Sequence, residues 1–155
     1  LFNQKALYTK LEEEIARAQR YQRELGFIML DLDHFKQVND QHGHLAGSGT
    51  LKLVAQVIQK SIRTVDWAAR FGGDEFCVAL PETDAAGTMV AAERIRRNIE
   101  NYPFHPSPLV LLRVKASLGA AVLQPGINGA GLIKLADDAL YRAKAGGRNQ
   151  VNSSF

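Results

Sequence analysis

The order of helical and strand segments in this 155-residue sequence predicts an α/β (α+β) domain, with a central mixed and largely antiparallel sheet flanked by helices. Three observations support this fold. A continuous apolar run at 27–30 is typical of a buried central strand. A Gly-Gly turn at 72–73 between two apolar segments indicates a β-hairpin. Long segments with apolar side chains at helical spacing alternate with these strands.

The first part of the chain predicts three helices and one strand. Asn3 caps the first helix, because an Asn side chain satisfies free N–H groups at a helix start. Gly43 interrupts the helical pattern and separates a short helix from a longer one. We expect helices at 3–24, 35–40 and 46–63, and the central strand at 27–30, which leads into Asp31-Leu32-Asp33.

The second part predicts a hairpin, two helices and two further strands. Thr83 or Asp84 caps one helix, and Gly146-Gly147 ends the other. The resulting α-β-α-α-β-β-α-β-α-β order is typical of ferredoxin-like and polymerase-palm folds. We expect hairpin strands at 65–70 and 77–80, a helix at 84–102, a loop at 103–108, a long strand at 109–123, a helix at 130–145 and an edge strand at 148–151.

Size and composition indicate one domain spanning 1–155, and the start at Leu1 suggests that it was cut from a longer multidomain protein. The net charge of +3 fits phosphate binding but does not indicate a nucleic-acid partner. No apolar run approaches the ~20 residues that span a bilayer. The single cysteine, Cys77, lies in an apolar strand, which favours a reduced core thiol in a cytoplasmic domain. Whether the full-length protein is attached to a membrane stays open.

Three acidic residues follow or begin predicted strands. Asp31 ends the central strand, and Asp74 and Glu75 lie at the hairpin tip. If the hairpin pairs beside the central strand, these carboxylates meet and supply hard oxygen ligands for Mg²⁺ or Mn²⁺. Such a metal bridges phosphate oxygens and neutralises the charge of a displaced pyrophosphate. The alternative is that these are ordinary solvated acids beside a turn.

Several motifs together resemble the GGDEF family of nucleotide cyclases. The run 31–44 (DLDHFKQVNDQHGH), with Gly47 and Leu51 after it, is similar to the signature of that family. The run 71–76 (FGGDEF), preceded by Arg70, matches its naming motif. Ser117-Leu118-Gly119 and the segment 143–149 resemble its later motifs. The resemblance covers nearly the whole chain in the right order.

The resemblance implies a nucleotidyltransferase that condenses two nucleoside triphosphates into a 3′,3′-cyclic dinucleotide with release of pyrophosphate. Each subunit of a homodimer holds one triphosphate, and the 3′-hydroxyl of each attacks the α-phosphate of the other. GTP is the expected substrate, the cyclic dinucleotide is a ligand as well as the product, and an upstream sensor domain is expected in the full chain.

The resemblance also implies roles for individual residues. For Lys36 and Lys144 the alternative to a functional role is that they are solvated surface lysines. For Asn39 the alternative is that it caps the end of a helix. Backbone amides at a helix start form an anion site, which gives the predicted phosphate contacts a physical basis. The implied roles are metal binding by Asp31, the Leu32 carbonyl and Asp74; metal binding or hydroxyl activation by Glu75; phosphate contacts from Lys36, Lys144 and Arg148 and from amides near His34 and Phe35; room for α-phosphate and ribose at Gly72 and Gly73; and base recognition by Asn39.

An inhibitory site is implied by Arg63-Thr64-Val65-Asp66, which precedes Gly72 at a fixed offset. In this family an Arg-x-x-Asp at that offset binds the product dinucleotide and holds the enzyme inactive. Arg63 can form paired bonds to phosphate or to a guanine edge, and Asp66 can accept from guanine. Arg94 falls where the family often has a helper arginine.

Ser48 departs from the family pattern, which has Gly-Asp where this chain has Gly47-Ser48. A carboxylate only accepts and therefore selects the donors of guanine, whereas a hydroxyl donates or accepts. We expect a ten- to hundredfold relaxation of base choice, since charge-assisted bonds contribute roughly 1.5–3 kcal/mol. This resembles the hybrid promiscuous branch, which takes GTP and ATP and makes cyclic GMP-AMP. A strict diguanylate cyclase with weaker guanine binding and a non-catalytic receptor are the other interpretations.

Overall fold

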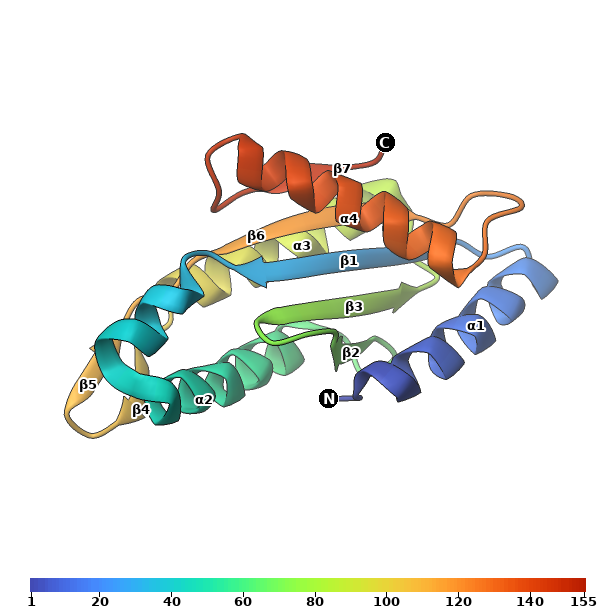
Figure 1. The fold of residues 1–155 in the computed structure, drawn as a ribbon. Helices are drawn as coiled ribbons and strands as arrows, with labels where there is room; N and C mark the ends of the chain where they lie inside the picture. The colour runs from blue at the N-terminus through green and yellow to red at the C-terminus, as the bar shows by residue number, and fades with distance from the viewer.

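The computed structural model describes residues 1–155 and shows a five-stranded sheet with two helices on each face (Figure 1). A separate two-stranded hairpin lies at one end of the molecule. The helices are α1 (Gln4–Arg20), α2 (Phe35–Ser61), α3 (Ala85–Asn101) and α4 (Gly129–Ala145). The sheet contains β1 (Leu25–Leu32), β2 (Trp67–Arg70), β3 (Glu75–Pro81), β6 (Ala116–Val122) and β7 (Val151–Ser153), and the hairpin contains β4 (Phe104–Ser107) and β5 (Val110–Leu112).

The strand order of the sheet is β2-β3-β1-β6-β7. Strand β1 lies at the centre and pairs antiparallel with β3 and β6, and β2 pairs antiparallel with β3. Only the edge strand β7 is parallel to its neighbour β6. The predicted mixed, largely antiparallel sheet with a central apolar strand is therefore confirmed.

The side chains of β1 alternate between two hydrophobic cores, because successive residues of a strand point to opposite faces. Ile28 and Leu30 pack with α2 and α3 on one face. Phe27 and Met29 pack with α1 and α4 on the other. Since all eight residues of β1 are buried, the apolar run reads as continuous rather than alternating in the sequence.

Side-chain caps and glycines set the helix boundaries. Asn3 accepts a hydrogen bond from the backbone N–H of Ala6 and starts α1, as predicted. The helix ends at Arg20, earlier than expected, and Gln22 just beyond it has a positive φ of 53°. Within α2, Gly43 has φ 87° and ψ 167°, so the predicted break between two helical pieces is present.

The prediction of a loop at 103–108 followed by one long strand was wrong. The chain forms the β4–β5 hairpin and then a separate strand, β6. Phe104 is fully buried and anchors β4 in the core that includes α2. Pro106 and Pro108 suggested a loop, but an edge strand tolerates proline because one side of it needs no ladder hydrogen bond.

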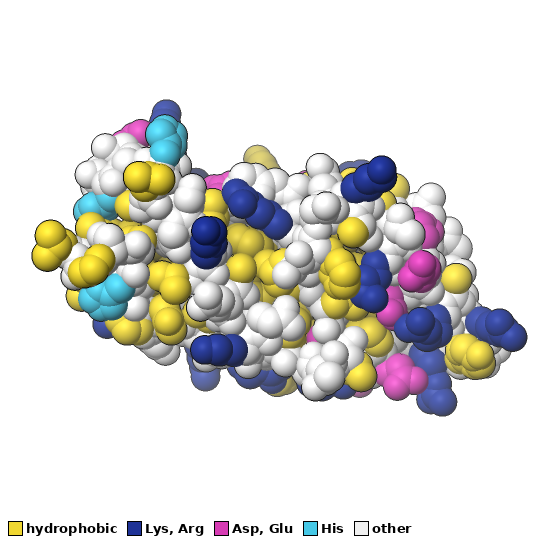
Figure 2. All heavy atoms as spheres, turned by 90° about the horizontal axis from the view of Figure 1, so that it is seen from below, with side chains coloured by type: hydrophobic (Ala, Val, Ile, Leu, Met, Phe, Trp, Pro, Cys, Tyr) yellow, Lys and Arg dark blue, Asp and Glu magenta, His cyan; other side chains and the backbone are white.

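The lower face of the molecule carries basic side chains that are dispersed among apolar and uncharged ones (Figure 2). Histidine side chains gather at the end where the start of α2 and the β4–β5 hairpin lie (Figures 1 and 2). Leu45 and Leu109 are both highly exposed, at 92% and 97%. None of the helices is both long and apolar enough to cross a bilayer.

Cys77 is expected not to react with Ellman's reagent in the folded protein. Its side chain is fully buried in β3, and burial raises the pKa of the thiol to about 12. Because the thiolate is the nucleophile, a neutral buried thiol near pH 8 reacts only when the domain opens. We expect the native protein to release none of the reagent's coloured thiolate within an hour in buffer, and one equivalent per protein chain in denaturant. Rapid reaction of the native protein would contradict this burial.

Candidate functional site

The ends of two neighbouring strands bring the predicted acidic residues together. Asp31, near the end of β1, lies opposite Glu75, which begins β3. The backbone N–H of Leu32 donates to the carbonyl of Asp74 at 3.2 Å. Helix α4 adds Lys144, whose ammonium group binds the Asp31 carboxylate. Three carboxylates and one lysine from distant parts of the chain thus share one site.

Asp31 is held in an environment that disfavours its charge. The residue is 8% exposed, and its Oδ1 atom has no hydrogen-bond partner. Burial raises the pKa of Asp31 above its ordinary value, the hydrogen bond from Lys144 opposes this, and the nearby Asp74 carboxylate raises it further. A buried carboxylate oxygen without a partner is a group that a bound cation would satisfy.

The surroundings of Glu75 also disfavour its negative charge. Burial raises the pKa of Glu75, and the charges of Asp31 and Asp74 add to that effect. A Cβ on Gly72 would stand 2.8 Å from Oε2 of Glu75, so the Glu75 side chain fills the space beside Gly72. A Cβ on Gly73 would meet nothing within 4 Å. Neither glycine has a positive φ. Because only Gly73 has open space beside it, Gly73 alone offers the room expected for a nucleotide.

Arg70 fixes the shape of the hairpin tip. Its guanidinium donates to the carbonyls of Gly72 and Gly73, with Nη2 at 2.6 Å from the oxygen of Gly73. The N–H groups of Phe71 and Gly72 both donate to the carbonyl of Glu75. The tip is therefore a bonded turn that carries Asp74 toward β1, rather than a free loop.

The acidic residues fit a hard divalent cation only if the substrate completes the site. No three His, Cys, Asp or Glu side chains lie close enough together to form a metal site by themselves. Mg²⁺ is commonly held by one or two carboxylates together with water and substrate phosphates, which agrees with such an incomplete set. Asp31 and Asp74 provide hard oxygen atoms, and the free Oδ1 of Asp31 fits this chemistry.

The start of α2 is the segment predicted to contact phosphate. His34 has a left-handed φ of 56°, and the helix begins at Phe35, so the first N–H groups have no partner within the helix. Such a helix start favours an anion. Lys36 is exposed on the first turn, and Arg148 is exposed just after α4.

Asn39 and Ser48, the two residues expected to contact the base, lie on opposite sides of the Gly43 break in α2. A Cβ built on Gly47 would stand 1.8 Å from Oδ1 of Asn39, so any side chain at position 47 would displace the Asn39 amide from its present place. Ser48 comes next in the chain and is exposed. Asn39 therefore lies beside Gly47, the residue before Ser48, although the break at Gly43 separates them along the helix.

A family model described as "Diguanylate cyclase, GGDEF domain" matches residues 1–150. The chain belongs to the GGDEF family. It is 41% identical to diguanylate cyclase DgcP of Pseudomonas aeruginosa over 151 residues, which are 96% of this chain and 22% of that protein. It is 40% identical to the probable diguanylate cyclase DgcT of Escherichia coli K12, over 97% of this chain and 33% of that protein. The family is one of nucleotidyltransferase enzymes.

Solved GGDEF domains have the same palm-like fold. The crystal structure of the GGDEF domain of DgcB from Caulobacter crescentus, in complex with c-di-GMP, superposes with a TM-score of 0.93 at 34% identity, covering 98% of this chain and 88% of that one. The active GGEEF domain of a diguanylate cyclase from Vibrio cholerae gives a TM-score of 0.93 at 31% identity, over 100% and 98% of the two chains. The chain spans only about a fifth to a third of the curated relatives' length.

In this GGDEF domain the predicted inhibitory pair lies at the opposite end of the β1–β3 ladder from the acidic site. Arg63 donates to the carbonyl of Pro81, which pairs with Leu25, whereas Asp31 pairs with Glu75. Six residues of strand separate these ends, about 20 Å. The Arg63–Asp66 pair is therefore separate from the acidic cluster, and its predicted inhibitory role stays a prediction.

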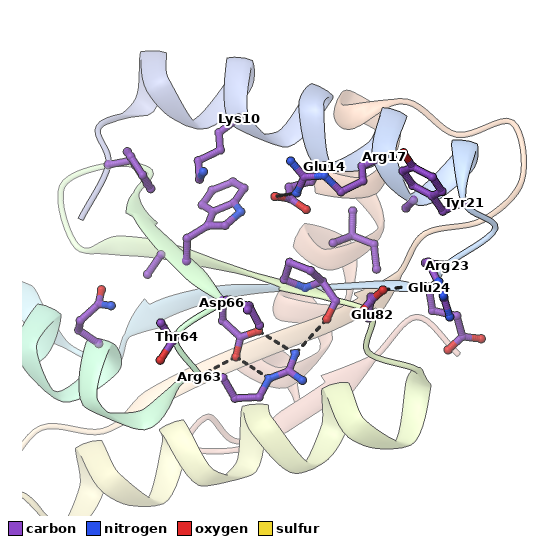
Figure 3. Close-up of a pocket in the computed structure, with 18 of the residues that line it drawn as sticks. Lys10, Glu14, Arg17, Tyr21, Arg23, Glu24, Arg63, Thr64, Asp66 and Glu82 are labelled. Atoms are coloured by element: carbon purple, nitrogen blue, oxygen red, sulfur yellow. Dashed lines mark hydrogen bonds and ion pairs between the residues drawn. The ribbon is translucent and has the colours of Figure 1, made fainter.

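Arg63 and Asp66 are bonded to each other. Asp66 accepts from the backbone N–H, Nε and Nη2 of Arg63, at 2.8, 3.1 and 2.8 Å. The Asp66 side chain is 1% exposed and that of Arg63 is 52% exposed, so Arg63 alone offers a free surface. Both line a cavity of about 910 Å³, and Lys10, Glu14 and Arg17 of α1 face them across it (Figure 3).

Arg94 lies beside the end of α2. Its Nε donates to the carbonyl of Ser61 at 2.7 Å, two residues before Arg63. The helper arginine is therefore near the Arg63–Asp66 pair but is occupied by a helix carbonyl. Its predicted role in product binding stays a prediction.

The sequence alone did not reveal the connections around Asp33, Arg96 and Asn149. Asp33 accepts a hydrogen bond from the backbone N–H of Asn149 at 2.9 Å. Arg148 and Asn149 have left-handed φ values of 65° and 45°. For residues other than glycine such a conformation costs about 1–2 kcal/mol, so other contacts must hold it. The signal available in the sequence was the Gly147-Arg148-Asn149 run itself.

Proposed function

We propose that this domain condenses two molecules of GTP into cyclic di-GMP, with release of two molecules of pyrophosphate. The observation that carries the proposal is the meeting of Asp31, Asp74 and Glu75 with Lys144 beside the start of α2. The curated relatives are named diguanylate cyclases, and the DgcB structure contains c-di-GMP. These names favour GTP as the substrate over the mixed use of GTP and ATP.

The domain would hold one triphosphate along the carboxyl end of β1. Asp31, Asp74 and the carbonyl of Leu32 would hold Mg²⁺ or Mn²⁺, which when bound neutralises phosphate charge and lowers the pKa of a coordinated hydroxyl. Glu75 would complete the metal site or take the proton of the attacking hydroxyl. The attack forms an O3′–Pα bond, breaks the bond from Pα to the oxygen bridging to Pβ, and frees pyrophosphate.

Basic groups on both sides would orient the triphosphate. Lys36 and the first N–H groups of α2, at His34 and Phe35, would contact it from one side, and Lys144 and Arg148 from the other. Lys144 now binds Asp31, so substrate binding would require it to exchange a carboxylate for a phosphate partner. Positioning and charge neutralisation supply most of the catalysis in phosphoryl transfer.

Two copies of the domain are needed, because each nucleotide is both the attacking group and the target. We propose a homodimer that apposes the two acidic sites, formed under the control of a sensor domain elsewhere in a longer chain. Cyclic di-GMP would bind at Arg63 and hold the two domains apart. For Asp66 to contact a guanine, the present Arg63–Asp66 bonds would have to open first.

Ser48 supports a second candidate, in which ATP is also accepted and cyclic GMP-AMP is formed. Ser48 is exposed and follows Gly47, which lies against Asn39, and its hydroxyl can donate or accept a hydrogen bond. A strict diguanylate cyclase would derive its guanine selectivity from Asn39 and neighbouring groups instead. The two candidates share the same chemistry and differ only in the base that the site admits.

Product analysis decides between them. The full-length protein is incubated with Mg²⁺ and GTP, ATP, or an equal mixture, and the products are separated. We expect cyclic di-GMP from GTP alone, and cyclic di-GMP alone from the mixture if guanine selectivity is strict. Cyclic GMP-AMP in the mixture would establish the second candidate, and no pyrophosphate under any condition would refute both.

Replacing Ser48 with Asp is expected to strengthen the preference for GTP by about ten- to hundredfold, because a carboxylate accepts from guanine donors and repels the unprotonated N1 of adenine. The measurement is the ratio of kcat/KM for GTP and ATP. Lys52→Gln, one turn further along α2, serves as the control. A ratio that does not change in Ser48→Asp would show that Ser48 does not contact the base.

A further inference from the structure

Hydrogen bonds join four segments, far apart in the sequence, behind the turn that carries Arg148. Asp33, just after β1, accepts from Oγ of Ser117 at 2.6 Å and from the backbone N–H of Asn149 at 2.9 Å. Asn149 follows α4, and its side chain reaches α3. Its Nδ2 donates to Oε2 of Glu100 at 2.6 Å, and its Oδ1 accepts from Nη1 of Arg96 at 2.9 Å. We call Asp33, Arg96, Glu100 and Asn149 the polar brace.

Arg96 is the most tightly held member of the polar brace. Its side chain is 14% exposed, and it donates to both carboxylate oxygens of Glu93, at 2.7 and 3.0 Å, and to Glu100 at 2.7 Å. Burying a guanidinium this far from water is costly unless such partners replace its lost hydration. Arg96 therefore has a fixed position from which it orients the Asn149 amide.

Asn149 is suited to its place by having both a donor and an acceptor. The amide gives its N–H to a carboxylate and its oxygen to a guanidinium, so the two ends cannot exchange without losing both bonds. An aspartate there would place two carboxylates together at Glu100. The chemistry of the polar brace thus specifies asparagine beyond its tolerance of a left-handed backbone.

The polar brace holds a turn whose backbone would otherwise be unfavourable. Gly147, Arg148 and Asn149 have consecutive positive φ values of 116°, 65° and 45°. Two non-glycine residues adopt this conformation only where surrounding contacts enforce it. The guanidinium of Arg148 has no hydrogen bond of its own, so its direction depends on the turn.

The same bonds tie this turn to the other phosphate-binding segment. Asp33 lies next to His34 at the start of α2 and two residues after Asp31. Its bond to the N–H of Asn149 sets the spacing between the two segments that flank the proposed triphosphate. A shift of the Arg148 turn would therefore widen the site on one side only.

We infer that Arg96 and Asn149 are positioning residues, which act through the Arg148 turn to hold Arg148 against the terminal phosphates of the bound nucleotide. This inference rests on the proposed function, since it assumes a triphosphate between the start of α2 and the end of α4. Neither residue would touch the nucleotide, and the sequence indicated no role for either.

Arg96→Gln in the full-length protein tests the inference, with Arg97→Gln as the matched control. Arg97 is the next residue of α3, is 69% exposed and binds only Glu93. We expect Arg96→Gln to raise the KM for GTP about tenfold, equivalent to about 1.4 kcal/mol, with kcat changed less than about threefold. Amide hydrogen exchange over 146–150 should become faster than in Arg97→Gln, by more than any change in melting temperature accounts for.

Asn149→Gly provides a second variant, because glycine keeps the left-handed backbone and removes only the side chain. It should show the same rise in KM and the same faster exchange, and it decides the matter if Arg96→Gln does not fold. Equal KM and equal exchange in Arg96→Gln and Arg97→Gln would overturn the inference, as would a lower melting temperature with unchanged KM. If the wild-type protein makes no cyclic dinucleotide, the proposed function fails, and the exchange comparison still decides whether the polar brace holds the turn.

Discussion

Asp31→Asn is expected to lower cyclic dinucleotide synthesis about a thousandfold or more, without lowering the stability of the domain. The loss in rate follows from removing a negatively charged metal ligand, whose contribution to transition-state stabilisation is several kcal/mol, each 1.36 kcal/mol being tenfold in rate. Stability should hold or rise because the carboxylate is 8% exposed and one of its oxygens has no partner. Lys144, 34% exposed, can turn to water when its partner is neutral.

The measurements for Asp31→Asn are initial rates of pyrophosphate release and thermal melting without added metal. Asp138→Asn serves as the control, because Asp138 lies on α4 and forms an exposed pair with Lys134. Such surface pairs contribute about 0–1 kcal/mol to stability, so the melting temperature of Asp138→Asn should change little. Its reaction rate should stay within about twofold of wild type. If Asp31→Asn kept more than a tenth of the wild-type rate, Asp31 would not be a metal ligand. A large fall in melting temperature would show that its role is structural.

Gly119→Ala is expected to destabilise the domain by about 3 kcal/mol, which lowers the melting temperature by on the order of 10 °C. Gly119 lies in β6 beneath α4, and a Cβ there would stand 2.0 Å from the carbonyl oxygen of Ala136 and 2.3 Å from the backbone nitrogen of Leu140. Backbone atoms of a packed helix cannot move aside as a flexible side chain can. The helix must lift from the sheet, and Lys144 moves with it.

Gly73→Ala is the matched control for this effect. A Cβ at Gly73 would meet nothing within 4 Å, and its φ is not positive, so the fold should tolerate alanine. Urea unfolding followed by circular dichroism compares the two variants. Equal midpoints for Gly119→Ala and Gly73→Ala would contradict the close packing of α4 on β6.

Local patterns were sufficient to predict the sheet and its main helices. The apolar run of β1, the Gly-Gly hairpin and the caps Asn3 and Asp84 all act over a few residues, and each has a side-chain chemistry that favours one structure. The meeting of Asp31 with Glu75 followed from the assumption that the hairpin pairs beside the central strand. The antiparallel register of β1 and β3 then places Asp31 opposite Glu75.

Contacts between distant segments were beyond sequence reasoning. The β4–β5 hairpin depends on burial of Phe104 against the core, which overrides the loop signal of its prolines. The bonds from Lys144 to Asp31 and from the Asn149 N–H to Asp33 join residues more than a hundred positions apart. Nor did the Arg63–Asp66 spacing reveal that the pair is already bonded internally. These features depend on how helices dock on the sheet.

The most direct test of the central claim is the stoichiometry of the reaction with GTP and Mg²⁺. The purified full-length protein is incubated at high concentration, and consumed GTP, pyrophosphate and cyclic di-GMP are each quantified. We predict two GTP consumed and two pyrophosphate released for each cyclic di-GMP, with no product in Asp31→Asn. The proposed function would be contradicted if the wild-type protein bound GTP yet released no pyrophosphate. It would also be contradicted if the Asp31→Asn variant made cyclic di-GMP as well as the wild type does.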